Sequence, residues 1–308
     1  MKNKLTYFLL GVSACLVFSL FVNAAGVGNK YFSFIKKGSG ENLAMPVQTT
    51  FAVKLPESVS FAGEAVPLDD PEVRERLDRE LTVNAYWQSA TIFLMKRANR
   101  FFPTIEKILT EEGVPQDFKY LALAESGLDN VVSSAGAAGY WQFLKSSGIQ
   151  YGLTINDEID QRYDIEKSTR AACKYLKYAY GQTGSWTAAA GGYNMGISGI
   201  SKQQALQGET AYYHLLLNSE TSRYVQRIVA LKIIMENPKD YGFYLTPEDL
   251  YPPFKYTTQT VSSKTNWVEF AKSNNISYKL LRVYNPWIRD MNYTNKDKGS
   301  YEVKIPQL

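Results

Sequence analysis

A single glutamate on an otherwise apolar helical face is the first candidate for chemistry in this sequence. Pro115 favours the start of a helix and Gly127 favours its end. Between them Phe118, Leu121 and Glu125 recur at helical spacing and share one face. A carboxyl group carried into an apolar face loses hydration, which raises its pKa, and a general acid that works near neutral pH needs such a shift. The alternative interpretation is an exposed glutamate that closes a core helix.

The composition limits the chemistry that the rest of the chain can supply. The 308 residues include one histidine, His214, and two cysteines, Cys15 and Cys173. With so few histidines and cysteines, a His/Cys metal cluster and a disulfide scaffold are excluded. A Ser-His-Asp triad is unlikely for the same reason. The net charge of +4 indicates neither nucleic-acid binding nor disorder. We therefore expect catalysis by carboxylates, amides and hydroxyls, with no metal or other cofactor.

Residues 1–24 have the pattern of a signal peptide or a membrane anchor. Lys2 and Lys4 precede a long apolar run, and Ala24 ends a small-residue segment of the kind that signal peptidases cleave. The run is just long enough to span a membrane uncleaved. Cys15 lies in a segment that resembles a bacterial lipobox, in which it would be lipidated. All three alternatives predict export to the periplasm or the cell envelope; the sequence indicates no oligomeric state.

Helical periodicity dominates the middle of the chain, so residues 72–252 are predicted to form a mostly α domain. Residues 25–71 mix Gly, Ser and Pro with short apolar pieces, which we interpret as a linker or an arm lying on that domain. Besides the glutamate helix, helices are predicted over 72–86, 87–99, 103–112, 140–145, 166–180, 185–190 and 220–235. The glycine pair Gly191-Gly192 is expected to break the helix before it and to bend the segment after it.

The pattern changes after Pro252, where we place a domain boundary. Strand-like stretches over 256–261 and 301–305 enclose two short helical patterns over 267–272 and 278–284. Residues 253–308 are therefore predicted to form a small β-α-α-β unit.

Four short motifs, in order along the chain, resemble a known family. They are Glu125-Ser126, Gly139-Tyr140-Trp141-Gln142, Gly192-Tyr193-Asn194-Met195-Gly196 and Glu220-Thr221-Ser222-Arg223-Tyr224-Val225. Together they resemble the lytic transglycosylases with a goose-lysozyme-like (SLT) domain, and most closely the branch called membrane-bound lytic murein transglycosylase D. The resemblance covers residues 85–240. It implies a lysozyme-like catalytic domain of the goose type and an enzyme that acts on peptidoglycan.

The resemblance implies that Glu125 is the only catalytic acid and base. It would protonate the glycosidic oxygen between N-acetylmuramic acid and N-acetylglucosamine, and then accept the proton of the C6 hydroxyl that attacks the anomeric carbon. The product would end in 1,6-anhydromuramic acid, and no water would be consumed. Ordinary glycosidases use two carboxylates. Two alternatives therefore stay open: a lysozyme-type hydrolase whose second acid is Asp129 or Asp160, and a non-catalytic peptidoglycan-binding protein.

The resemblance also implies a set of substrate-binding residues, each with a structural alternative. The hydroxyl of Tyr224 is expected beside the catalytic acid, one helical turn after Glu220, which would brace the helix. The alternative for Ser126 is a cap on its helix end, and that for Gln142 is core hydrogen bonding. Trp141 is expected in the core rather than on a sugar. The expected substrate-binding residues are Ser126, Ser133, Gln142, Tyr193, Asn194 and Tyr224.

The C-terminal unit resembles a diverged LysM module, a small glycan-binding domain. Asn285-Pro286-Trp287 and the last strand fit such a module, but Ser262-Ser263-Lys264-Thr265 stands where a Gly-Asp-Thr turn is expected. We expect the fold of the module to be kept and leave its glycan binding open. Because its composition differs from that of the helical domain, we expect bond cleavage not to need it.

Overall fold

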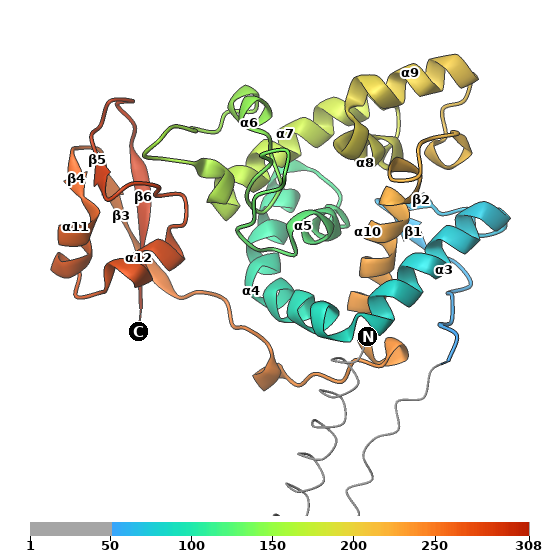
Figure 1. The fold of residues 1–308 in the computed structure, drawn as a ribbon, viewed down its shortest axis with the longest axis horizontal. Helices are drawn as coiled ribbons and strands as arrows, with labels where there is room; N and C mark the ends of the chain where they lie inside the picture. Colours follow the sequence, from blue (N-terminus) through green and yellow to red (C-terminus); the bar gives the residue numbers. More distant parts are fainter. Residues whose placement is uncertain (1–50, 308) are drawn as a thin grey trace, which may run out of the picture. The chain divides into compact units, whose positions relative to one another are not determined.

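The computed structural model describes residues 51–307 of the chain (Figure 1). The predicted signal peptide, anchor and lipobox lie outside the described residues, as does the first part of the predicted arm, 25–50. Within the described range, no helix is both long enough and apolar enough to cross a membrane. This part of the chain is predominantly helical, with short strands near its beginning and its end.

The helical domain consists of eight α-helices and several single turns of 3-10 helix among the described residues. The α-helices are α3 (Pro71–Tyr86), α4 (Gln88–Glu112), α5 (Phe118–Ser126), α6 (Lys145–Gln150), α7 (Ile165–Thr183), α8 (Trp186–Met195), α9 (Ile197–Gln207) and α10 (Thr221–Glu236). The 3-10 turns are η1 (Gln161–Tyr163), η2 (Tyr212–His214), η3 (Pro238–Tyr241) and η4 (Pro247–Asp249). Side chains at the preceding residue cap three of these α-helices: Asp70 caps α3, Asp164 caps α7 and Ser185 caps α8.

Helix α5 lies between α4 and α10 in the interior of this domain (Figure 1). Phe118 and Leu121 are completely buried, as the helical spacing predicts. The ring of Phe118 stands edge-on to that of Phe61, with 5.2 Å between the centroids. The packed face of α5 therefore carries Glu125 into the interior at its last turn.

The two ends of α5 agree only in part with the sequence prediction. Gly127 ends the helix in the left-handed conformation, with φ at 61°, as expected. The helix begins at Phe118 rather than at Pro115. The reason is that residues 115–118 form a turn in which the N–H of Phe118 donates to the carbonyl of Pro115 at 3.2 Å.

Helix α4 is continuous, so the predicted break between residues 99 and 103 is wrong. Pro103 lies inside the helix, on an exposed face, so the carbonyl of Asn99 that loses its partner faces outward. Met95 and Ile105 are buried on either side of the proline, which holds both halves against the same core.

Helix α8 also runs past its predicted end, because it continues through Gly191 and Gly192 to Met195. Both glycines are buried, and a Cβ atom on Gly191 would lie 2.5 Å from Cε2 of Tyr212. The first glycine therefore allows close packing instead of a bend. The predicted bent segment carrying Tyr193 is the last turn of a helix.

The predicted helix over 140–145 is also wrong, because residues 140–142 form a turn and Phe143 forms an isolated β-bridge with Ala138. Gln142 has a positive φ of 49°, which a right-handed helix does not accommodate. The next helix, α6, begins at Lys145.

The described part of the predicted arm packs on the helical domain through a minimal hairpin, β1 (Ser60–Phe61) and β2 (Glu64–Ala65). Phe61 is completely buried. The carboxylate of Glu64 accepts hydrogen bonds from the backbone N–H groups of Trp186 at 2.6 Å and Thr187 at 2.9 Å. A carboxylate at the start of a helix complements the helix dipole, so the arm fixes the beginning of α8.

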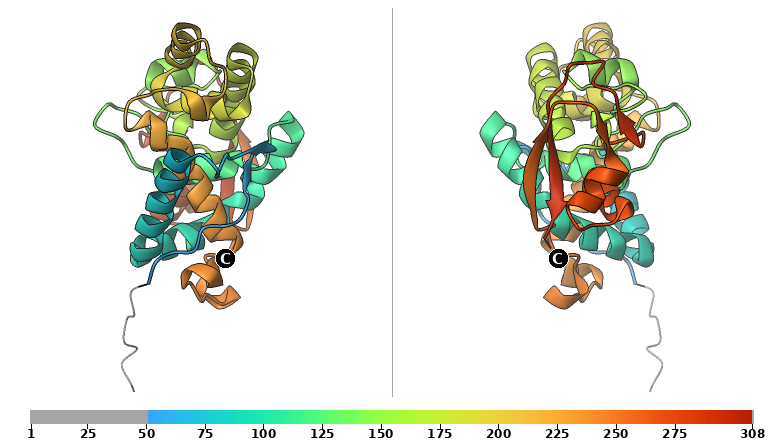
Figure 2. Two further views of the ribbon diagram at one scale, coloured as in Figure 1. Left: turned by 90° about the vertical axis from the view of Figure 1, so that its right-hand side faces the viewer. Right: turned by 90° about the vertical axis from the view of Figure 1, so that its left-hand side faces the viewer.

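The C-terminal unit contains the predicted strands and helices and one additional pair of two-residue strands. Its elements are β3 (Tyr256–Val261), β4 (Thr265–Asn266), α11 (Trp267–Ser273), α12 (Tyr278–Tyr284), β5 (Asn292–Tyr293) and β6 (Tyr301–Pro306). Strands β3 and β6 are antiparallel over their whole length, from Tyr256 opposite Pro306 to Val261 opposite Tyr301, and lie side by side in Figure 2. Strands β4 and β5 form a second antiparallel pair.

The core of the C-terminal unit includes residues of the helical domain. Ala138, Ile159 and Tyr163 belong to the same buried cluster as Trp267 and Val303. The loop 154–164 also exchanges hydrogen bonds with the unit. The N–H of Asp160 donates to the carbonyl of Trp287 at 2.8 Å, and the carboxylate of Glu158 accepts from the N–H of Thr294 at 2.8 Å. This shared core links the folding of the helical domain to the unit, and the expectation that bond cleavage does not need the unit stays a prediction.

Candidate active site

Glu125 is a half-buried carboxyl group in the last turn of α5. One of its oxygens, Oε1, accepts a hydrogen bond from the hydroxyl of Tyr224. Burial raises the pKa of Glu125 above its usual range. The hydrogen bond from Tyr224 and the charge of Arg227 act against this shift, whereas the negative charge of Glu220 adds to it. The sequence-predicted acid therefore has the raised pKa that its apolar helix face indicated.

Tyr224 lies in the first turns of α10 and is buried. Burial raises the pKa of its hydroxyl well above 10, and the neighbouring charge of Glu125 raises it further. Tyr224 is therefore protonated and acts as a donor to the carboxyl group. The structure thus brings Tyr224 into contact with Glu125, as the family resemblance implied.

Ser126 is used for the local structure at the end of α5. Its Oγ lies 2.8 Å from the carbonyl oxygen of Tyr140 and accepts a hydrogen bond from the N–H of Leu128 at 3.0 Å. This arrangement corresponds to the structural alternative for Ser126, a cap on the helix end. It also ties the end of the catalytic helix to the loop 131–143.

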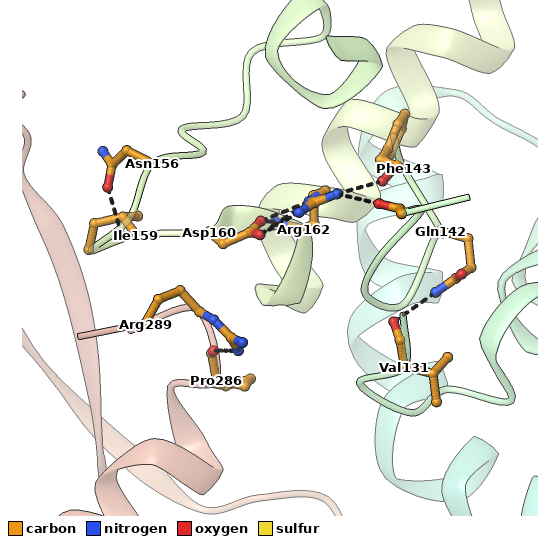
Figure 3. Close-up of polar contacts among 10 residues, drawn as sticks. Val131, Gln142, Phe143, Asn156, Ile159, Asp160, Arg162, Pro286 and Arg289 are labelled. Carbon is orange, nitrogen blue, oxygen red and sulfur yellow. Dashed lines mark hydrogen bonds and ion pairs between the residues drawn. The ribbon is translucent and has the colours of Figure 1, made fainter. Parts of the chain in front are cut away.

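The loop 131–143 carries Ser133 and Gln142, and Gln142 is one of its internal braces (Figure 3). Nε2 of Gln142 donates to the carbonyls of Val131 at 3.1 Å and Gly139 at 2.9 Å. Ser133 is exposed, and its Oγ accepts from the N–H of Ala137 at 3.1 Å. The hydrogen bonds found for both side chains lie within the loop.

Tyr193 and Asn194 lie at the end of α8, near the start of α10. The hydroxyl of Tyr193 donates to the carbonyl of Trp141 at 2.6 Å, and burial raises its pKa well above 10, with a further contribution from the charge of Glu125. Oδ1 of Asn194 accepts from the hydroxyl of Thr221 at 2.8 Å, and its Nδ2 donates to Glu220 at 3.2 Å. Glu220 is expected to stabilise its own helix, and in the structure its carboxylate accepts a hydrogen bond from Asn194 at the end of α8.

Two regions of the chain match models of known protein families. Residues 103–216 match the transglycosylase SLT domain, and residues 257–308 match the soluble lytic transglycosylase C-terminal LysM-like domain. The chain carries an SLT transglycosylase domain followed by a LysM-like domain. The first match includes Glu125, Gln142 and Asn194, and the second covers the C-terminal unit from the second residue of β3 onward.

Two curated relatives from Escherichia coli, strains K12 and O6:H1, are described as membrane-bound lytic murein transglycosylase D. Each is 28% identical to this chain over 257 residues, which cover 80% of this chain and 55% of the relative. The chain thus spans about half the length of the curated relatives it matches.

Asp129 and Asp160, the two candidates for a second catalytic acid, have different surroundings in the SLT domain. Asp129 is exposed, with Arg97 at 3.9 Å. Asp160 is 6% exposed and forms an ion pair with Arg162 at 2.7 Å. Neither is among the groups whose charge shifts the pKa of Glu125, whereas Glu220 is. Glu220 is therefore a third candidate for a second acid near Glu125, and the sequence offered no reason to propose it.

Arg162 is a structural residue of the site that the sequence analysis missed (Figure 3). Its NH1 donates to the carbonyls of Gly136 at 3.0 Å and Phe143 at 3.1 Å, at two separate points of the loop 131–143. Its other nitrogens bind both carboxylate oxygens of Asp160. The available signal in the sequence was the Asp-x-Arg spacing. Asp160 precedes the 3-10 turn η1, and its carboxylate accepts from the N–H of Arg162, so the two side chains lie close together.

A second network orders the face of α10 that carries Tyr224. Glu80, on α3, is 3% exposed, and its carboxylate accepts from Nε of Arg223 at 2.8 Å. Its other oxygen lies 3.7 Å from Nε of Arg227, the cation whose charge opposes the raised pKa of Glu125. A buried carboxylate thus lies beside the cation whose charge lowers the pKa of Glu125.

The described residues contain neither a group of metal ligands nor a reactive thiol. Among them, no three His, Cys, Asp or Glu side chains are grouped closely enough to hold a metal ion. Cys173 is a free, buried thiol, and burial raises its pKa to about 12. A thiol with such a pKa is not a nucleophile at neutral pH.

Proposed function

We propose that this chain is a peptidoglycan lytic transglycosylase that cleaves the β-1,4 bond between N-acetylmuramic acid and N-acetylglucosamine. The observation that carries the proposal is the pair of Glu125 and Tyr224, a carboxyl group with a raised pKa and a protonated hydroxyl that donates to it. The SLT domain match and the name of the two relatives support the same substrate class.

The proposed reaction uses Glu125 twice. In its protonated form, favoured by burial, it donates a proton to the glycosidic oxygen while the bond from that oxygen to the anomeric carbon breaks. The carboxylate that results is stabilised by the hydrogen bond from Tyr224. It then accepts the proton of the sugar's C6 hydroxyl as this oxygen bonds to the anomeric carbon. The acid form of Glu125 is restored, and the product ends in 1,6-anhydromuramic acid.

A single carboxylate suffices for this reaction because the attacking oxygen belongs to the substrate. A hydrolase on the same fold needs a second carboxylate to activate water. Asp160 is held in an ion pair with Arg162, and Asp129 lies exposed with Arg97. We therefore favour the transglycosylase over the hydrolase, with Glu220 as the residue to examine if hydrolysis is found.

The remaining site residues have proposed roles around this acid. We propose that Ser126, Ser133, Gln142, Tyr193, Asn194 and Tyr224 form the substrate-binding part of the site. Most of their hydrogen bonds hold the loop 131–143, the end of α8 and the start of α10 in place. Their contribution to sugar binding would thus be made largely through the shape of these three segments.

We also propose a location and a domain arrangement for the chain. An exported protein attached to the cell envelope fits the pattern of residues 1–24 and the description of the two relatives as membrane-bound. Incorporation of a palmitate analogue that depends on Cys15 would support a lipoprotein, and its absence together with a free N-terminus after Ala24 would support a cleaved signal. We place the catalytic domain at 72–252 and the LysM-like unit at 253–308.

The decisive experiment compares the products of wild-type protein with those of Glu125→Gln. Mass spectrometry of digested peptidoglycan should find anhydromuramic ends with the wild type. Cleavage should fall by a factor on the order of a hundred or more in the variant, the usual share of one positioned proton donor. Glu75→Gln is the matched control, since it makes the same chemical change on an exposed carboxylate of α3 and should remain active. Reducing muramic ends in the wild-type digest would instead identify a hydrolase.

Stability measurements separate this loss from misfolding. Because the folded protein raises the pKa of Glu125, ionisation of this group lowers the free energy of unfolding as pH rises through that pKa. The amide of the Gln variant cannot ionise. Urea unfolding at alkaline pH should therefore show the variant to be at least as stable as the wild type.

A further inference from the structure

A groove lies between the SLT domain and the LysM-like unit, outside the Glu125–Tyr224 pair. Its volume is about 670 Å³, and it is open to solvent. One side is formed by α4 and by residues 128–130, which follow the catalytic helix, and the other by α12 and the chain at 251–254. We call it the basic groove because four cationic side chains line it, Arg97, Arg100, Lys279 and Arg282, against one carboxylate, Asp129.

Part of the positive charge of the basic groove has no protein partner. Lys279 is exposed on α12, and the described residues provide it with no ion pair or hydrogen bond. Nε of Arg282 is buried without a hydrogen-bond partner, whereas its NH1 donates to the hydroxyl of Tyr278 at 2.9 Å. A buried donor without a partner costs free energy in the isolated protein. An acidic ligand in the groove would pair with Lys279 and bring negative charge close to the guanidinium of Arg282.

The two arginines on α4 are held more firmly. Nε of Arg97 donates to the carbonyl of Gly127, and Nε of Arg100 donates to the carbonyl of Pro252 at 3.1 Å. The guanidinium of Arg100 lies over the rings of Tyr251, at 5.0 Å, and Phe254, at 4.4 Å. The groove thus combines fixed cations with aromatic faces, which suits a ligand that has both carboxylates and aliphatic parts.

The basic groove begins at the end of the catalytic helix. Leu128 and Asn130, which line it, follow Glu125 by three and five residues. Tyr140, another lining residue, provides the carbonyl that lies 2.8 Å from Oγ of Ser126. A ligand in the groove therefore lies against the same segments that position the catalytic acid.

We propose that the basic groove binds the acidic peptide stems that peptidoglycan carries on its muramic acid residues. This inference rests on the proposed function, because it assigns a further part of the same substrate. The stems branch sideways from the glycan strand and carry free carboxylates, which Lys279, Arg282 and the two arginines of α4 complement. The LysM-like unit then forms half of a substrate site, since Lys279 and Arg282 both belong to it.

Cleavage kinetics on two substrates test the proposal. One substrate is soluble peptidoglycan with intact stems, and the other is the same glycan after an amidase has removed the stems. Lys279→Glu reverses a charge on an exposed residue that has no partner, so the fold should be kept. It should raise KM for the stem-bearing substrate on the order of fivefold and leave KM for stem-free strands unchanged. Arg282→Gln should act in the same direction.

Lys272→Glu is the matched control, because Lys272 is an exposed lysine on α11 of the same unit but does not line the groove. Its KM values should equal those of the wild type on both substrates. An equal effect of Lys279→Glu on both substrates, no effect on either, or the same effect from Lys272→Glu would overturn the proposal.

The failure of this inference differs from failure of the proposed function. If the wild type produced no anhydromuramic ends from either substrate, the proposed function would be wrong. If it cleaved both substrates and the groove variants matched the wild type, only the stem site would be wrong. Calorimetric titration of Glu125→Gln with the two substrates gives a readout independent of turnover: the stem-bearing substrate should bind more tightly, and Lys279→Glu should abolish that difference.

Discussion

The ion pair between Asp160 and Arg162 tests how the loop 131–143 is held beside the catalytic helix. The side chains of Arg162 and Asp160 are 11% and 9% exposed, so the pair is nearly removed from water. Arg162 also donates to the carbonyls of Gly136 and Phe143. Arg162→Ala removes both loop contacts and leaves the Asp160 carboxylate buried with an uncompensated charge.

The expected cost of Arg162→Ala is about 3–5 kcal/mol, the range for removing one partner of a buried pair. A loss of that size lowers Tm on the order of 10 °C in a domain of this length. Asp160→Asn should cost less, about 1–3 kcal/mol, because the arginine keeps its two carbonyl partners. Adding Asp160→Asn to Arg162→Ala should recover part of the loss, since it removes the unpaired charge.

Urea unfolding of the four proteins measures these differences, and cleavage at a temperature where all are folded measures the effect on the site. Arg162→Ala should raise KM, because the loop that carries Gln142 loses its anchor. Asp160→Asn should retain cleavage. A cost below about 1 kcal/mol for Arg162→Ala would refute the reasoning. Loss of cleavage in a folded Asp160→Asn protein would make Asp160 a chemical participant and restore the hydrolase alternative.

Three further predictions follow from other parts of the structure. Tyr224→Phe removes a hydrogen-bond donor to the charged form of Glu125, so the pKa of Glu125 should rise and the alkaline limb of the pH–rate profile should move to higher pH. An unmoved limb would contradict the assignment of that limb to Glu125. Removing residues 252–308 uncovers a shared core and should lower the urea midpoint of the remaining domain, whereas an unchanged midpoint would show the unit to be independent. Gly191→Ala should destabilise by about 1–3 kcal/mol in thermal unfolding, because its Cβ would lie 2.5 Å from the ring of Tyr212; a neutral result would mean that the ring can move.

The parts of the fold that depend on local periodicity were predictable from the sequence. The buried face of α5 follows from spacing alone, and Gly127 ends that helix as its residue type indicates. The helix breaks predicted at Pro103 and Gly191 are wrong for one reason. Each residue type has a propensity to break a helix, and tertiary packing overrides that propensity. The packing partners that decide these cases, such as Tyr212 beside Gly191, come from distant parts of the chain.

The site was predictable only in part. Glu125 could be found from the helix face that carries it, but Tyr224 lies 99 residues further along the chain. No periodicity relates two residues on different helices, so only the resemblance paired them. Arg162 escaped notice because its partners are backbone carbonyls of the loop 131–143, which no side-chain pattern records. The shared core escaped notice because Ile159 lies between the acidic residues Glu158 and Asp160, in a stretch without regular periodicity.

The balance of effects on the pKa of Glu125 fits the two proton transfers of the proposed mechanism. Burial alone favours the acid form and disfavours the carboxylate that the proposed second step needs. Ion pairing alone would favour the carboxylate and leave no proton to donate. In this site the Tyr224 hydroxyl and the Arg227 charge oppose burial without cancelling it, and Glu80 keeps Arg227 at the edge of the site, with its Nε 3.7 Å from the Glu80 carboxylate. In the proposed mechanism the proton can therefore leave Glu125 and return to it within one catalytic cycle, with the Tyr224 hydroxyl donating to the carboxylate and the negative charge of Glu220 favouring return of the proton.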